Sequence, residues 1–438
     1  MSELLQHPDR GLFERELHAE HIDETGFLLV QRQRYLPNPA VGWQRAGDLD
    51  QRILAHLYAM RELGRPAFES ARRALGDADE YRALAAIFLV AAIGLEMPEL
   101  AAVQGLAAAE PDRLPLWTHA LSLAPGPDLG AALAPVLDGE RLDARVAAIT
   151  ILGIRRQGRL NQLETLLQHD APEVRGAAAL ALARRGYREA ARAMEVLLAD
   201  DPAANAEHLV LPLLLLGSTR AVDHCRRACA GEHPSFSGLP LLLAMGGDVS
   251  TAPLLQGAVP GASAEEMVRA LGILGAASAV PALIDRLASN SPAVQLEASL
   301  ALERICRSGM KEKTTVPVEI DEEDLEPGSP GPSAGALPAP TREVERVSTS
   351  RVEWERWWNK NRVDFDGKRR YRGGKPLDAG ICIDEVAAAD APLEDRRRAA
   401  QELAIHFRQH LPFEPDALIG VQRAAIAGWR SWLSAQSR

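Results

Sequence analysis

One short motif occurs twice in this sequence, and its return constrains the fold more than any other feature. The stretch APEVRGAAALALAR at 171–184 reappears as SPAVQLEASLALER at 291–304. Val174, Ala178 and Leu182 are among the positions that return unchanged, and their i, i+4, i+8 spacing places them on one face of an α-helix. Several positions between them change freely, as solvent-facing positions would. The fold therefore buries the same helix face at two places in the sequence, at 171–184 and at 291–304.

A series of glycines, each of which follows an apolar segment, explains this separation. Consecutive members of the series lie about 30 residues apart, the period of a helical repeat. Glycine is favoured just beyond a helix end because it accepts the left-handed conformation that closes the last turn. Each interval holds two helical segments, and a lone helical hairpin buries little, so neighbouring hairpins must stack. The sequence therefore predicts an all-α fold, an α-solenoid of helical hairpins. The glycines are Gly64, Gly94, Gly126, Gly158, Gly186, Gly217, Gly246, Gly275 and Gly309.

The returning positions also predict how the hairpins pack. Ala181 and its counterpart Ala301 are small enough to let neighbouring helices approach closely, and Leu182 and Leu302 fill the space between layers. Arg175 falls on the variable face. We expect its replacement to cost far less stability than the loss of a core leucine.

Composition excludes several classes of protein. A formal net charge of −11 argues against non-specific binding of nucleic acid or anionic membranes by the whole body. The longest apolar run, at 83–95, is shorter than the ~20 residues that cross a bilayer. The first residues lack the apolar core of a signal peptide, and four sparse cysteines favour a reducing compartment. We expect a cytoplasmic protein without a membrane span.

Two resemblances add to this pattern. DAPEVRGAAALALARRG, at 170–186, resembles the short HEAT-like repeat also found in phycobilisome lyases. The leader HIDETGFLLVQRQRYLPNP, the segment LDQRILAHLYAMRELG and the tail WERWWNKNRVDFDGKRRYRGGKP together resemble a family of uncharacterised proteobacterial HEAT-repeat proteins often encoded beside type VI secretion genes. The resemblance implies a HEAT-like solenoid and a secretion context. The resembling family has no established catalytic residues that could be assigned to positions of this sequence.

Composition shifts along the chain predict four segments. The third is rich in Pro, Gly, Ser and acid, with too few apolar residues for a core, and is typical of a disordered linker. In the last segment, Asp366 and Gly367 predict the turn of a short β-hairpin, between a Trp-rich helix and a final helical pair. The segments are an N-terminal helical leader at 1–47, the solenoid at 48–310, the acidic linker at 311–349 and a C-terminal cap at 350–438.

Two clusters of chemically notable residues permit alternative interpretations. In HCRRACAGEH, Cys225 and Cys229 are neighbours on a helix and could join His224 and His233 at a metal, but no second cysteine pair exists and packing is favoured. The stretch 351–375 combines three tryptophans with nine Lys or Arg against four acids. It could stack on single-stranded nucleic acid, although aromatic residues at helical spacing more often seal the end of a repeat stack. We predict no metal, no cofactor and no nucleic-acid partner.

Arginines recur near the turns of consecutive repeats, where stacking could align them as a basic ridge for an acidic partner. The linker acids at 319–326 could dock on the same ridge, or both features could simply be solvated. No nucleophile–base motif is present, so we expect a non-enzymatic scaffold for protein partners, an accessory or adaptor of type VI secretion. The alternative is a HEAT-repeat enzyme of the lyase-like or DNA-repair type. The predicted partner-binding residues are Arg155, Arg156, Arg184, Arg185, Arg188, Arg226 and Arg227.

Overall fold

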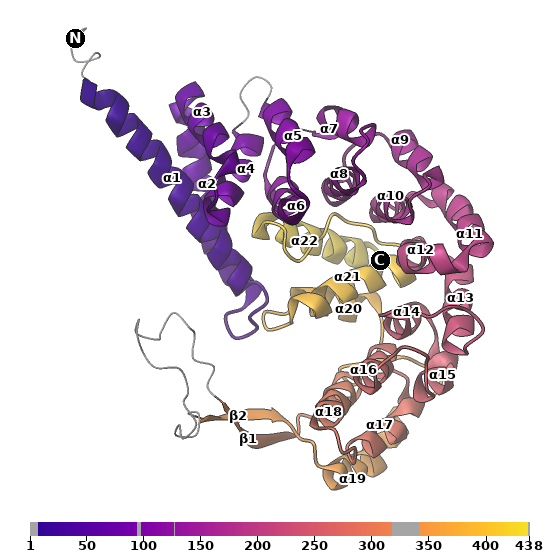
Figure 1. Cartoon of the computed structure of the whole chain (residues 1–438). Helices are drawn as coiled ribbons and strands as arrows, with labels where there is room; N and C mark the ends of the chain where they lie inside the picture. Colours follow the sequence, from indigo (N-terminus) through magenta and orange to yellow (C-terminus); the bar gives the residue numbers. More distant parts are fainter. Residues whose placement is uncertain (1–7, 94–97, 127, 318–340, 437–438) are drawn as a thin grey trace, which may run out of the picture. The chain divides into compact units, whose positions relative to one another are not determined.

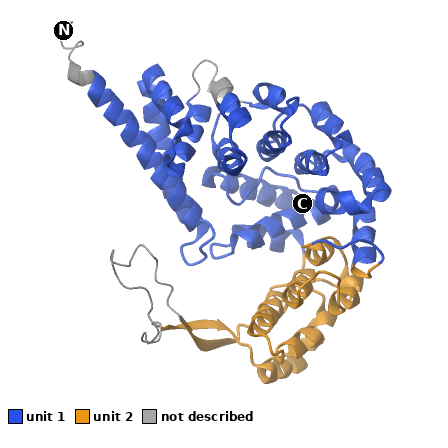
Figure 2. Cartoon of the chain, in the orientation of Figure 1, with its two compact units in different colours: residues 1–228, 232–236, 378–438 blue, residues 229–231, 237–377 orange. Residues whose placement is uncertain are grey.

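The computed structural model describes residues 8–93, 98–126, 128–317 and 341–436. The chain splits into two compact units (Figure 2): unit 1 holds residues 1–228, 232–236 and 378–438, and unit 2 holds 229–231 and 237–377. Helices make up most of both units, and the strands of the described part lie in two small two-stranded sheets. The predicted all-α solenoid with a small β part is confirmed.

Unit 1 is a curved double layer of helices. In Figure 1, α6, α8, α10 and α12 form the inner layer and α5, α7, α9 and α11 the outer layer, and consecutive inner helices contact one another. The helices of unit 1 are α1 (Pro8–Tyr35), α2 (Ala46–Leu63), α3 (Arg65–Arg73), α4 (Glu80–Ala92), α5 (Pro98–Ala108), α6 (Leu114–Leu123), α7 (Gly130–Leu137), α8 (Leu142–Arg155), α9 (Leu160–Thr165), α10 (Pro172–Arg184), α11 (Ala191–Asp200), α12 (Pro202–Leu215), α13 (Thr219–Cys229), α20 (Ala379–Ala387), α21 (Leu393–Phe407) and α22 (Ile419–Gln436).

The repeated motif forms inner helices in both units. Helix α10 starts at Pro172, where a missing N–H donor costs little, and Val174, Ala178 and Leu182 are buried on it. The following Gly186 has a left-handed φ of 67°. In the glycine series, Gly94 lies outside the described residues, and Gly126 and Gly246 are not left-handed. The others have positive φ, but Gly64 has a ψ of −143° and is not left-handed, and the left-handed caps of α8 and α18 are Arg156 and Arg307. The glycines with positive φ are Gly64, Gly158, Gly186, Gly217, Gly275 and Gly309.

Small residues bring the inner helices together. A Cβ atom on Gly153 of α8 would lie 2.8 Å from the Ala181 Cβ of α10. In unit 2, a Cβ atom on Gly272 would lie 2.7 Å from the Ala301 Cβ. Both distances are shorter than real carbon contacts, so only Gly–Ala pairs permit this approach. The predicted role of Ala181 and Ala301 is confirmed, and the motif meets a glycine of the preceding inner helix each time.

Arg175 is half-buried and does not simply face solvent, whereas the smaller cost of its replacement stays a prediction. Its Nη2 donates to Asn205 Oδ1 at 2.7 Å, and its Nη1 donates to His169 O at 2.8 Å. Positions 145, 175 and 205 are one repeat apart, and Arg145 likewise contacts His169 from the preceding inner helix. The repeats are therefore joined by a ladder of polar side chains at one helix position. Sequence variation at this position did not mean exposure to solvent, because a long side chain can reach across to the next repeat.

The apolar run at 83–95 forms buried α4 up to Ala92, and every α4 residue from Ala83 to Ala92 is buried. Helix α4 contacts both α1 and α6. Contact on several sides explains why this helix is apolar all round. Across the described ranges, no helix is both long enough and apolar enough to span a membrane.

The C-terminal helices correct the predicted domain boundaries. Residues 350–438 do not form one cap, because α20, α21 and α22 belong to unit 1 whereas 351–377 belong to unit 2. The predicted solenoid at 48–310 is likewise divided between the units. Figure 1 shows α21 and α22 on the concave side of the unit 1 array, and α21 contacts α12 while α22 contacts α2. Contacts between such distant segments leave no trace in local sequence patterns.

Unit 2 continues the repeat pattern on a smaller scale. Inner helices α14, α16 and α18 contact in order, and the Trp-rich α19 packs on α17. Its elements are α14 (Leu239–Gly246), α15 (Ala252–Gln256), α16 (Ala264–Leu274), α17 (Val280–Arg286), α18 (Pro292–Cys306), β1 (Lys311–Pro317), β2 (Thr341–Val347), α19 (Arg351–Asn361), β3 (Tyr371–Arg372) and β4 (Lys375–Pro376).

The predicted β-hairpin exists but its turn is displaced. Strands β3 and β4 pair antiparallel around Gly373 and Gly374, whose φ values are 60° and 75°. Two consecutive positive φ values match the twist of a tight hairpin, and two glycines adopt them at least cost. The expected turn residue Asp366 instead accepts from the Lys368 amide at 2.9 Å, in a local turn before the hairpin.

The predicted disordered linker is wrong at both of its ends. Strands β1 and β2 pair antiparallel from Lys311 opposite Val347 to Pro317 opposite Thr341. Ion pairs link the strands, including Lys313–Glu343 at 2.6 Å. Charged side chains that seemed to exclude a strand are matched across the pair, which stabilises an exposed ribbon. The acids at 319–326 lie outside the described residues.

We predict that Leu182→Ala lowers the free energy of unfolding by about 2–5 kcal/mol, because it removes a fully buried side chain between layers. Arg175→Ala should cost about 1–3 kcal/mol, since it removes a donor from the buried Asn205 amide oxygen. The exposed Arg192 provides a matched control, and Arg192→Ala should change stability by less than about 0.5 kcal/mol. Urea unfolding followed by circular dichroism measures all three. Equal effects at Arg175 and Arg192 would contradict the ladder.

Candidate functional site

Two arginines of the predicted ridge cap the preceding repeat. Arg155 Nη1 donates to Leu121 O at 3.0 Å and also to Ala124 O. One repeat later, Arg185 Nη1 donates at 2.9 Å to Gly158 O, in the loop between α8 and α9. The last carbonyls of a helix lack intrahelical partners and carry partial negative charge, so they attract a cation. Arg155 and Arg185 therefore tie consecutive repeats together.

Two other ridge arginines hold the segment 408–418, which connects α21 to α22. Arg156 donates to His410 O and Leu411 O. Arg184 Nε lies 2.8 Å from Glu414 Oε1, and the two side chains are only 22% and 18% exposed. Burial lowers the pKa of Arg156 to about 10, which still leaves it charged at neutral pH. Part of the ridge thus contacts an acidic segment of the same chain, at 408–418.

A buried ion pair anchors the other end of this segment. Arg32 is 0% exposed, and its Nε donates to Asp50 Oδ1 at 2.6 Å. Its Nη1 donates to Asp416 O at 2.8 Å and its Nη2 to Ala417 O at 2.5 Å. Asp50 Oδ2 in turn accepts from the Ile419 amide at the start of α22. Nothing in the sequence marked Arg32 or Asp50, because their partners lie at the far end of the chain.

The remaining ridge arginines lie apart from this segment's backbone contacts. Arg188 and Arg227 are exposed. Arg226 Nη1 lies 3.2 Å from Asp223 Oδ1, one turn away on α13. The assignment of the seven arginines to a partner surface stays a prediction.

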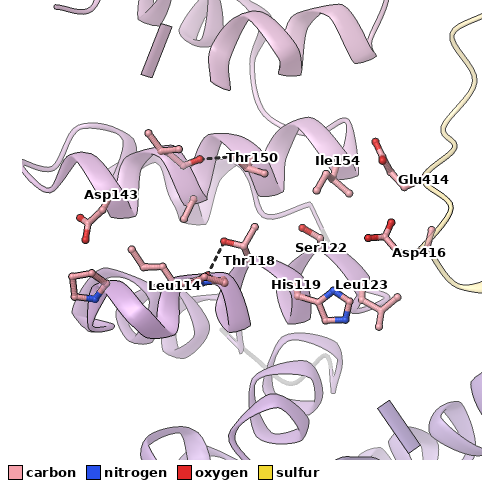
Figure 3. Close-up of a pocket in the computed structure, with 15 residues that line it drawn as sticks. Leu114, Thr118, His119, Ser122, Leu123, Asp143, Thr150, Ile154, Glu414 and Asp416 are labelled. Atoms are coloured by element: carbon pink, nitrogen blue, oxygen red, sulfur yellow. Dashed lines mark hydrogen bonds between the residues drawn. The ribbon is translucent and has the colours of Figure 1, made fainter. Parts of the chain in front are cut away.

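The 408–418 segment closes one side of a pocket in unit 1. The pocket has a volume of about 500 Å³ and lies between α6, α8 and residues 414–417. Figure 3 shows α6 and α8 on opposite sides, with Glu414 and Asp416 approaching from the C-terminal segment. Most of the wall is apolar and includes Leu114, Val146 and Ile154. The sequence does not predict this pocket, because its walls come from α6, α8 and the segment before α22.

The polar groups of the pocket fall into two classes. Thr118 and Thr150 donate to the carbonyls of their own helices, Leu114 O and Val146 O, both at 2.8 Å (Figure 3). His119 Nε2 and Ser122 Oγ are buried atoms without a hydrogen-bond partner in the described structure. His119 and Ser122 are i, i+3 neighbours on α6, so they share one helix face.

Charge in and beside the pocket is nearly balanced by local pairs. Glu414 pairs with Arg184, and Asp143 lies 2.7 Å from Arg141 Nη2. The half-buried Asp416 carboxylate makes no hydrogen bond or ion pair with described residues, although its charge acts on His119. Asp416 is thus the carboxylate of this pocket whose charge no neighbouring side chain neutralises by direct contact.

His119 is held neutral by its surroundings. Burial is the main cause that lowers the pKa of its imidazole, because it disfavours the charged form. The Asp416 carboxylate opposes this effect, and Arg32 reinforces it. A neutral imidazole has one nitrogen that accepts a hydrogen bond, which is a property that a ligand could use.

The two clusters found in the sequence have structural roles. His224 and His233 stack with ring centroids 5.0 Å apart, and burial lowers the His224 pKa to about 4. Within the described ranges, no group of three or more His, Cys, Asp or Glu is placed to hold a metal ion. Trp354 is 0% exposed and its Nε1 donates to Ser348 O at 2.8 Å, while Phe365 and Tyr371 pack with ring centroids 4.7 Å apart. Trp354 therefore packs in the core of unit 2.

Comparison with known proteins agrees with the repeat geometry. The family model of HEAT repeats matches residues 130–210, which span α7 to α12. Residues 130–210 are therefore similar to HEAT repeats. No curated protein matches it. Among solved structures, it is similar to an engineered protein with 17% identity, covering 64% of this chain and 77% of that chain, at a TM-score of 0.29. It is also similar to human deoxyhypusine hydroxylase in complex with glycerol, with 16% identity over 64% of this chain and 96% of that chain, at a TM-score of 0.21.

We predict that Arg156→Ala loosens the 408–418 segment, because two backbone carbonyls lose a charged donor. Hydrogen bonds to charged groups contribute about 1.5–3 kcal/mol, so the protected amides of Gln409 and Ala417 should exchange about 10-fold faster or more. Hydrogen exchange with mass or NMR detection measures this. Arg227→Ala, which removes an exposed ridge arginine on α13, is the matched control and should leave these amides unchanged.

Acid should loosen the same segment through His410. Burial, and then Arg156, Arg188 and Arg408, lower the His410 pKa from 6.5 to about 4. The folded segment therefore binds fewer protons than the unfolded chain between these values, so its stability falls as pH drops from 6.5 towards 4. We predict faster exchange of the Gln409 amide at pH 5 than expected from intrinsic rates. His410→Gln, which cannot be protonated, should weaken this pH dependence, and an unchanged profile would contradict it.

Proposed function

We propose that this HEAT-repeat protein is a non-catalytic scaffold that binds a protein partner through the concave side of unit 1. The observation that carries the proposal is the pocket of about 500 Å³ between α6, α8 and the 408–418 segment. Its apolar walls and few polar groups are typical of pockets that receive a ligand or an anchoring side chain. The segment that closes the pocket is fixed by Arg32, Arg156 and Arg184, so the site is preformed.

The chemistry of the pocket favours binding over catalysis. His119, Ser122 and Asp416 are residue types found in hydrolytic triads, but a triad needs a hydrogen bond between base and nucleophile. His119 Nε2 and Ser122 Oγ have no such partner in the described structure. Their fixed positions on one helix supply hydrogen-bonding groups to a ligand more readily than a proton relay. The alternative HEAT-repeat enzyme would require these groups to rearrange.

The sequence resemblance supplies the cellular context of the proposal. We propose that the scaffold acts in the cytoplasm as an accessory or adaptor of type VI secretion, and that its partner is a component or effector of that system. The repeat architecture supports the scaffold part of this proposal, because stacked hairpins present an extended surface on which a partner can lie.

A pull-down with a pocket-blocking variant tests the proposal. Thr150 lines the pocket, and Thr150→Arg would place a long side chain into it while retaining helix propensity. Val196 on α11 is 48% exposed and outside the pocket, so Val196→Arg is the control. We expect the full-length wild type and Val196→Arg to retain the same protein from native cells, and Thr150→Arg to lose it. Recovery of the same proteins by all three forms would contradict binding at this pocket.

A further inference from the structure

Three hydrogen-bond acceptors line the pocket beside Ile154. Asp416 supplies a carboxylate without a paired cation, Ser122 a hydroxyl oxygen and His119 an imidazole nitrogen. In Figure 3, the Asp416 carboxylate points from the C-terminal segment towards Ser122 on α6, and the His119 ring lies at the same end of this helix. The effect of the Asp416 charge on His119 agrees with this proximity. The two α6 atoms are buried and unpartnered: the Ser122 hydroxyl can accept or donate a hydrogen bond, and a neutral His119 accepts one through one of its two ring nitrogens.

We propose that this pocket binds a primary ammonium group at the end of an unbranched alkyl chain, as found in a lysine side chain. The proposal rests on the proposed function insofar as the lysine belongs to a protein partner. A free aliphatic amine is the other source of the same chemistry, and the experiment below distinguishes the two.

An alkyl ammonium group matches this pocket in its number of hydrogen-bond donors, its charge and its shape. An ammonium group has three N–H donors and no acceptor, and the pocket offers three acceptors of which one is charged. The apolar side chains of Leu114, Val146 and Ile154 would contact the methylene stem, which a lysine readily buries.

The charges around the pocket exclude the opposite sign of ligand. Glu414 and Asp143 are each neutralised by an arginine, so Asp416 sets the local sign. An anion at this position would face the uncompensated Asp416 carboxylate. A cation gains a charge-assisted hydrogen bond instead, which is among the stronger polar contacts in proteins.

Binding of small probes to the full chain tests the proposal. The probes are Nα-acetyl-lysine N-methylamide, n-pentylamine and Nα-acetyl-norleucine N-methylamide, which keeps the alkyl chain but lacks the amine. Titration calorimetry or NMR shifts of residues in α6 would report binding. The proteins are wild type, Asp416→Asn, Ser122→Ala and the control Asp138→Asn, which changes an exposed aspartate after α7.

We expect wild type and Asp138→Asn to bind the lysine amide, Asp416→Asn to bind it at least about 10-fold more weakly, and the norleucine amide not to bind detectably. Stronger binding of pentylamine than of the lysine amide would support the ammonium site and identify a free amine as its source. Ser122→Ala removes an unpartnered hydroxyl, so it should fold normally and weaken binding even if Asp416→Asn does not fold.

Absence of lysine-amide binding to wild type, or equal binding of the lysine and norleucine amides, would overturn the proposal. Equal affinity of wild type, Asp416→Asn and Ser122→Ala would also overturn it. These results are independent of the pull-down. A chain that binds the amine but retains no pocket-dependent protein supports the ammonium site and contradicts the protein scaffold, whereas the converse result contradicts only the ammonium site.

Discussion

The close approach of neighbouring inner helices is the constraint on which the rest of the structure depends. Where Gly153 meets Ala181, and again where Gly272 meets Ala301, no larger side chain fits between the helices. This approach sets the repeat spacing, and the spacing in turn brings Arg175 within hydrogen-bond distance of Asn205 in the next repeat. Apolar packing and the polar ladder therefore specify the same stacking register, which favours a single arrangement over alternatives.

Arginine side chains link neighbouring repeats to one another and to segments outside the repeats, such as residues 408–418 and β3. The carbonyl end of α6 is a site of partial negative charge that Arg155 satisfies, and Arg185 binds carbonyls of the loop after α8. In unit 2 the same task falls to the β3 region, where Arg370 Nε donates to Leu274 O at 2.8 Å. A guanidinium has several donors in a rigid plane, so one side chain can satisfy carbonyls from more than one helix.

The pocket arises because the 408–418 segment follows the inner helices without filling the space between α6 and α8. Prolines on either side of Glu414, at positions 412 and 415, keep this segment from being helical, so its carbonyls are available to Arg32 and Arg156. The segment therefore contributes both a framework fixed by backbone contacts and side chains that remain free for a ligand. The proposed ammonium site rests on this fixed backbone and on the available Asp416 carboxylate.

The sequence by itself determined the repeat. Helix propensity, the recurring apolar face and the glycine period are local properties, so they predicted the hairpins, the buried positions such as Leu182 and the close packing at Ala181. Only the tertiary structure decided what the polar residues do. Arg175, Arg184 and Asp416 are charged residues of the kind that usually lie on a solvated surface. Their roles depend on partners in other repeats or at the far end of the chain. Hydrogen bonds and ion pairs act over a few ångströms in space, and a single sequence carries no record of which distant residues are brought that close.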